Sequence, residues 1–97
     1  MDGRVIVLHP GDNVATAVSD LAPGDVLQTD AATSLQVVEV VPFGHKVALI
    51  GIARGAAVIK YGESIGLATS DIPSGACVHI QNVESQRGRG DLPAQGS

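Results

Sequence analysis

Two short polar segments contain the residues best suited to acid–base or metal chemistry. The first is Gly44-His45-Lys46, in which a glycine gives close backbone access to a histidine at the start of an apolar strand. Histidine titrates near neutrality and binds metal ions, so His45 suits proton transfer or metal ligation. Side chains alternate along a strand, so Lys46 joins the same site only if the turn extends through both residues. The alternative is a turn histidine bonded to the backbone.

The second segment is His79-Ile80-Gln81-Asn82. In an extended strand the side chains of His79 and Gln81 lie on one face, and Asn82 lies at the strand end. One imidazole and two amides can bind the carboxylate or hydroxyls of a small polar molecule, or a hard cation through the amide oxygens. The alternative is a solvated edge strand.

A third segment adds charged and phenolic groups around a predicted turn. Lys60, Tyr61 and Glu63 supply a cation, a phenol and a carboxylate, which suit contacts to a substrate or the tip of a surface hairpin. His9, before Pro10, is most simply a loop residue. The sequence has no zinc-type spacing of Cys and His, no phosphate-binding loop and no Gly-x-Ser-x-Gly turn. A self-sufficient active site is therefore not predicted.

The elements that would position these residues are mainly β-strands joined by glycine turns. Related turn sequences end at Gly24, Gly55 and Gly75, and each is followed by an apolar strand candidate. One short helix is expected from Asp12 to Pro23, with Asp12 as its N-cap and apolar residues on one face. Further strands are predicted at residues 4–8, 35–41, 46–50, 58–61, 64–68 and 78–83.

Length and charge limit the class of protein. The 97 residues suit one domain, predicted here as residues 1–83 followed by a polar, flexible tail at 84–97. The net charge of −4 argues against nucleic acid as a partner. No signal peptide or membrane segment is recognisable, so a cytoplasmic protein is expected. The lone Cys77 lies in an apolar run and is interpreted as a buried, inert thiol.

The same motifs, in the same order, resemble a known family. The resemblance covers roughly residues 4–91 and identifies the altronate and galactarate dehydratases, whose N-terminal part is a SAF-type, β-clip domain. It is carried by residues 9–15 (HPGDNVA), 44–49 (GHKVAL), 58–66 (VIKYGESIG), 71–75 (DIPSG) and 78–82 (VHIQN).

The resemblance implies metal-assisted removal of water from a sugar acid to give a 2-keto-3-deoxy acid. It also implies a separate large catalytic subunit, which would supply most of the ligands of a divalent metal ion. This chain alone would then be an inactive lyase subunit. His45, Lys46 and His79 are then expected to be catalytic, with His45 and His79 also as metal ligands. Substrate contacts are expected from Lys60, Tyr61, Glu63, Gln81 and Asn82.

One departure from the family and three alternatives stay open. The family's closing motif commonly reads His-Val-His-x-His-Asn, and this chain keeps only its middle histidine, His79, with Cys77 and Gln81 beside it. The small subunit of sulfolactate sulfo-lyase is built on the same plan and is the second candidate. A free-standing module that binds a small ligand and a purely structural subunit are the others. Self-association of the isolated chain is a further open point.

Overall fold

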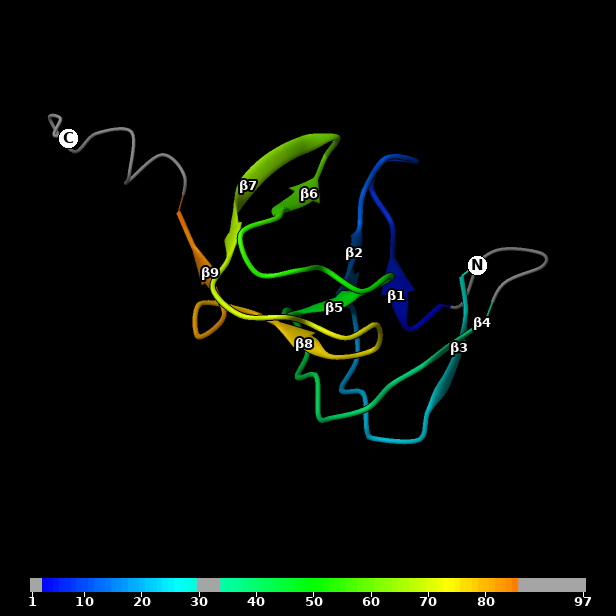
Figure 1. The fold of residues 1–97 in the computed structure, drawn as a ribbon. Coiled ribbons are helices and arrows are strands. Elements are labelled where there is room, and N and C mark those ends of the chain that lie inside the picture. The colour runs from blue at the N-terminus through cyan, green and yellow to red at the C-terminus, as the bar shows by residue number, and fades with distance from the viewer. Residues whose placement is uncertain (1–2, 30–33, 86–97) are drawn as a thin grey trace, which may run out of the picture.

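The computed structural model describes residues 3–29 and 34–85, which fold into short β-strands in three sheets (Figure 1). The central sheet has the order β1-β2-β5-β8, with the β3–β4 hairpin and the β6-β7-β9 sheet beside it. The described residues contain no helix that could cross a membrane. The strands are β1 (Val5–Ile6), β2 (Val14–Ala17), β3 (Val26–Gln28), β4 (Ser34–Gln36), β5 (Lys46–Ala48), β6 (Ala57–Lys60), β7 (Glu63–Ala68), β8 (Cys77–Val78) and β9 (Val83–Glu84).

Four tight turns of one type organise these strands. In each turn the third residue is a glycine with φ between 85° and 93°, the left-handed conformation that a type II turn requires. The amide of the fourth residue donates to the carbonyl of the first. The sequence predicts three of these turns, and their glycines are confirmed in this conformation, whereas the fourth, at Pro42–His45, was missed. The turns span Ala22–Asp25, Pro42–His45, Ala53–Ala56 and Pro73–Ala76.

The four turns associate in two equivalent pairs. Leu21 forms an isolated bridge with Val41, and Ile52 forms the same bridge with Ile72. In each pair an aspartate carboxylate also accepts a hydrogen bond from an amide of the partner turn, Asp20 from Phe43 at 2.8 Å and Asp71 from Arg54 at 2.9 Å. The chain therefore repeats one strand–turn unit with long-range contacts, and this repeat builds the compact β fold.

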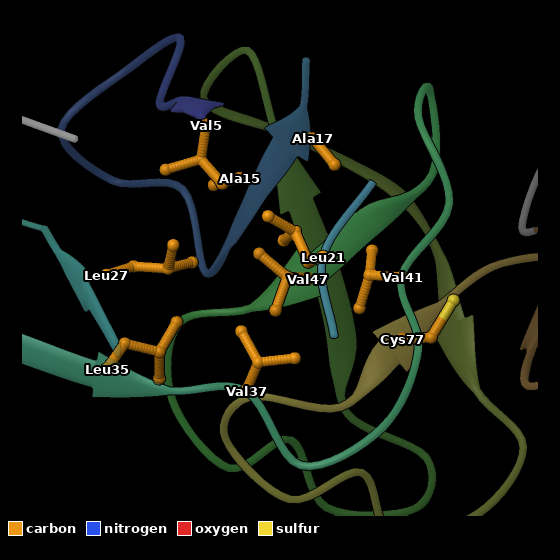
Figure 2. Close-up of a cluster of buried hydrophobic side chains, with 10 residues drawn as sticks. All are labelled: Val5, Ala15, Ala17, Leu21, Leu27, Leu35, Val37, Val41, Val47 and Cys77. Carbon is orange, nitrogen blue, oxygen red and sulfur yellow. The ribbon is translucent and has the colours of Figure 1, made fainter. Parts of the chain in front are cut away.

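Two clusters of small aliphatic side chains form the interior. The first lies between the central sheet and the β3–β4 hairpin, and Figure 2 shows its side chains converging. The second lies between the central sheet and the β6-β7-β9 sheet. The first contains Val5, Ala15, Ala17, Leu21, Leu27, Leu35, Val37, Val41, Val47 and Cys77. The second contains Val14, Ala48, Ile52, Val58, Ala68, Ile72, Ala76 and Val78.

The predicted N-terminal helix is wrong, because its first half is strand β2. β2 is paired on both edges, with β1 and with β5. Its two faces are also covered, since Val14 packs in the second cluster and Ala15 and Ala17 pack in the first. A strand buried on both faces shows no apolar–polar alternation. The apolar spacing in this segment therefore imitates a helical period.

Asp12, predicted as a helix cap, instead fixes the tip of the β6–β7 hairpin. Its buried carboxylate accepts hydrogen bonds from the amides of Tyr61, at 3.2 Å, and Gly62, at 2.8 Å. Tyr61 and Gly62 have φ of 58° and 72°, the positive values of a two-residue type I′ turn. A tyrosine rarely adopts this conformation. The two hydrogen bonds to Asp12 therefore help to stabilise this unfavourable turn conformation.

The last predicted strand, residues 78–83, is also wrong over its middle. β8 ends at Val78 and β9 begins at Val83, and a turn separates them. The other predicted strand segments each contain a strand, usually a shorter one than expected. β9 includes Glu84, which the sequence assigns to the tail, and the tail from residue 86 lies outside the described residues.

The turn at Gly75 packs directly against the backbone of Gln36 and Val37, so a substitution of Gly75 should be more destabilising than one in an equivalent turn. A Cβ at Gly75 would collide with the carbonyl oxygen of Gln36, whereas a Cβ at Gly24 would meet no atom. Both glycines have positive φ, so Gly24→Ala measures the conformational strain alone. We expect Gly24→Ala to cost about 1 kcal/mol of unfolding free energy. Gly75→Ala should cost clearly more, as measured by urea unfolding. Equal costs would contradict the packing described here.

Candidate functional site

His45 and His79 meet because β5 pairs with β8. The antiparallel register places Lys46 opposite Val78 and Val47 opposite Cys77. Continuing this register by one residue places His45, the last residue of the Pro42–His45 turn, opposite His79. The two sequence segments with the best candidate side chains, more than thirty positions apart, are therefore brought together by one strand pair.

The two imidazole rings are stacked face to face. Their centroids are 3.7 Å apart and the planes differ by 9°. Partial burial lowers the pKa of His79, and the neighbouring His45 and Lys46 lower it further by repulsion of a second positive charge. His79 Nδ1 is buried and has no hydrogen-bond partner. A buried ring nitrogen without a hydrogen-bond partner is unusual in a folded protein, so this nitrogen has an unused capacity to form a hydrogen bond.

Asn82 holds the turn that carries His79. Its side-chain oxygen accepts a hydrogen bond from the His79 amide at 2.9 Å, and its side-chain nitrogen donates to the Cys77 carbonyl at 2.8 Å. The Asn82 amide closes the turn by donating to the His79 carbonyl at 3.1 Å. The expected strand face shared by His79 and Gln81 is therefore absent. Both polar ends of the Asn82 side chain are engaged with the backbone, so its contacts position the turn.

Cys77 lies at the edge of the first cluster (Figure 2), next to the histidine pair. Its Sγ is 3.7 Å from His45 Nδ1, and its amide donates to the Glu39 carboxylate at 2.9 Å. Burial raises the pKa of the Cys77 thiol, and the Glu39 charge raises it as well. A hydrogen bond from Gln81 lowers this pKa by more than the Glu39 charge raises it, and the charge of Lys46 also lowers it, but burial is the largest cause and the pKa is raised overall. The predicted burial of Cys77 is confirmed, and a raised pKa favours the unreactive thiol.

Lys46 is half-buried on β5 and lies within electrostatic reach of the other cations. Burial lowers the pKa of its ammonium group, and the charge of Lys60 lowers it further, whereas the Cys77 thiolate would raise it. Lys46 and His79 both line a pocket of about 230 Å³ where the central sheet meets the β7–β9 pair. The other residues that line it are Ile65, Ile80, Val83 and Ser85.

The hairpin residues predicted to contact a substrate lie at the edge of this group. Lys60 Nζ is 5.1 Å from the centre of the Tyr61 ring, and the Lys60 charge reaches Lys46. Tyr61 and Glu63 are exposed and lie outside the pocket lining. His9 packs against the same hairpin, close to Gly62, and its Nδ1 accepts a hydrogen bond from the Gly11 amide.

The residues of this cluster do not fit a complete metal site. The lone pairs of an imidazole lie in the plane of the ring, so two stacked parallel rings cannot direct nitrogens at one ion. Residues 3–29 and 34–85 contain no group of three or more His, Cys, Asp or Glu side chains arranged to bind an ion. Metal ligation by His45 or His79 stays a prediction, and the remaining ligands would have to come from outside the described residues.

Several residues around the site were missed by the sequence analysis. Glu39 reaches the site through its hydrogen bond to the Cys77 amide, and Ile65, Val83 and Ser85 line the pocket, all over long sequence separations. Their local sequence carries no signal of this role, because an isolated Glu or Ser between strands looks like any exposed residue.

Comparison with known proteins identifies the family. The family model of the altronate/galactarate dehydratase SAF domain matches residues 3–86. This chain belongs to that family. The match agrees with the fold, since the SAF domain is mainly β and the described residues are all strand and turn.

Named relatives include two kinds of lyase. Altronate dehydratase of Escherichia coli (strain K12) is 42% identical over 97% of this chain, which spans 21% of that protein. Galactarate dehydratase (L-threo-forming) of the same organism is 41% identical over 75% of this chain and 14% of its own length. The (2R)-sulfolactate sulfo-lyase subunit alpha of Chromohalobacter salexigens is 31% identical over 84% of this chain and 94% of its own length. The SAF chain thus spans a small part of the dehydratases and nearly all of the sulfo-lyase subunit.

The chemical state of Cys77 can be tested directly, since it is the chain's one cysteine. Because the thiol is buried and its pKa is raised, we expect the folded chain to react with a disulfide reagent such as DTNB at least about tenfold more slowly than the unfolded chain. Release of thionitrobenzoate measures both rates at one pH. Equal rates would mean that Cys77 is an accessible thiol in the folded state.

Proposed function

We propose that this chain is the small subunit of a sugar-acid dehydratase and completes an active site on a separate large catalytic subunit. The reaction would eliminate water from a sugar acid and give a 2-keto-3-deoxy acid. The observation that supports this most is the stacked His45–His79 pair, with Lys46 beside it and an unpartnered ring nitrogen in it. These groups suit proton transfer, yet nothing among the described residues would hold a whole sugar acid.

The chemistry of elimination assigns roles to these side chains. The proton next to the carboxylate must be removed, and the hydroxyl on the next carbon must leave with a proton. A lowered pKa keeps the His79 imidazole neutral, so it can accept a proton. The Lys46 ammonium can stabilise the negative charge that develops on the carboxylate. A divalent metal ion would supply further stabilisation of that charge, and its ligands would lie mainly on the large subunit.

The second candidate is the small subunit of a sulfolactate sulfo-lyase. It is supported by the similarity to a (2R)-sulfolactate sulfo-lyase subunit alpha, which is 31% identical over 84% of this chain. Both reactions would eliminate a group next to an acidic carbon, so the roles of His79 and Lys46 carry over. The two candidates differ in the leaving group, which is water in one and sulfite in the other.

If the chain were a purely structural subunit, replacing His79 would leave the turnover of the complex unchanged. In the complex with the large subunit, His79→Ala should lower kcat/KM by about a hundredfold, because it removes a proton acceptor. His9→Ala removes an imidazole outside the cluster and serves as the control. Turnover is measured on altronate, galactarate and (2R)-sulfolactate, which also separates the two candidates.

Assembly must be checked in the same preparations. If His79→Ala still binds the large subunit and keeps full turnover, the chain is a structural subunit and the proposal fails. The chain alone should show no turnover on any of the three substrates.

A further inference from the structure

The pocket that His79 lines combines the charged Lys46 and the polar His79 and Ser85 with apolar side chains. It lies at the junction of two sheets, with Lys46 on β5, Ile65 on β7 and Val83 on β9. Ile80, at the tip of the His79–Asn82 turn, forms its rim and is 83% exposed. The pocket therefore places an exposed apolar side chain next to an ammonium group.

Within residues 3–29 and 34–85, no carboxylate forms an ion pair with the lysines of this region. Among the described residues, neither Lys46 nor Lys60 forms an ion pair, although the protein carries a net charge of −4. Glu39 directs its carboxylate to the amide of Cys77. Glu63 lies opposite Lys60 in the hairpin register, and the two side chains form no ion pair. A half-buried ammonium group with no counter-charge is costly unless a ligand supplies one.

The chemistry of the pocket selects the class of ligand. A bound anion would lose part of its water shell against Ile65, Ile80 and Val83, which would strengthen its attraction to Lys46. The His79 ring adds a group that can hydrogen-bond an oxygen atom. A volume of about 230 Å³ admits one small charged group with a short carbon chain.

We propose that this pocket binds a single oxyanion, the carboxylate or sulfonate of a small organic acid, with Lys46 as the charged ligand and His79 as a hydrogen-bond partner. Only the identification of this anion as part of the substrate rests on the proposed function. Binding itself requires no second subunit, so the proposal can be tested on this chain alone.

The test is an anion titration of the full isotope-labelled chain, followed by amide NMR at constant ionic strength. The probes are glycolate, a hydroxy carboxylate, and isethionate, a hydroxy sulfonate, with neutral ethylene glycol as the control. We expect saturable shifts at the amides of Lys46, His79, Ile80 and Val83 with one or both anions, and none with ethylene glycol. The absence of saturable shifts at these amides in the wild-type chain would overturn the proposal.

Two variants assign the binding to the lysine. Lys46→Met keeps the length of the side chain and removes its charge, and it should weaken binding about tenfold or more. Arg54→Met removes a positive charge from an exposed turn outside the pocket lining and should leave the affinity unchanged. Equal affinity of Lys46→Met and wild type would contradict the assignment. Unperturbed spectra around Leu27 verify that each variant is folded.

The comparison of the probes and the assembled enzyme separates the two proposals. Preference for isethionate indicates a sulfonate group as the ligand, and preference for glycolate indicates a carboxylate. If the isolated chain binds neither anion at this pocket but His79→Ala still lowers turnover of the complex, the present inference fails and the proposed function stands. Anion binding without any effect of His79→Ala on turnover would overturn the proposed function alone.

Discussion

The antiparallel pairing of β5 with β8 is the constraint on which the candidate site depends. A type II turn lies directly before each of these strands. The turn glycines, Gly44 and Gly75, adopt the positive φ that this turn requires. The pairing then sets His45 opposite His79 and places Lys46 within reach of both. Small shifts of register would turn these side chains to different faces, because strand residues alternate. The register is stabilised on both faces of the sheet, because Val47 is buried in the first cluster and Val78 in the second.

Several polar side chains around this site serve to hold the backbone in position. Asn82 uses both ends of its amide to hold the turn that carries His79, and Asp12 uses a buried carboxylate to hold the hairpin that carries Lys60. Near the site, His79 Nδ1 has no hydrogen-bond partner among the described residues and the Lys46 ammonium forms no ion pair with them, and both groups are suited to chemistry. Rigid support around unsatisfied groups is the arrangement expected of part of an active site. It is also consistent with a family in which the SAF domain forms part of larger dehydratases.

Local sequence was sufficient for some of these features and insufficient for others. The turns at Gly24, Gly55 and Gly75 were predictable, because a glycine between aliphatic runs has few other uses in a β protein. β2 was mistaken for a helix, since a strand covered on both faces carries no period-two signal. His45, Lys46 and His79 were selected as candidates from residue type and family resemblance, and their role in a site stays a prediction. Their stacking, and the parts played by Glu39 and Asn82, depend on pairing between distant segments, which spacing along the chain does not encode.

The proposal that this chain is one part of a larger lyase is tested most directly by identifying the proteins that it binds. The tagged chain is purified from a lysate of its own organism under conditions that preserve complexes, and its companions are identified by mass spectrometry. We predict a stoichiometric large chain with a dehydratase-like or sulfo-lyase-like sequence, and turnover of a sugar acid or of (2R)-sulfolactate by the recovered complex. Recovery of the chain alone, at a concentration where an obligate complex persists, would contradict the account and favour a free-standing ligand-binding module.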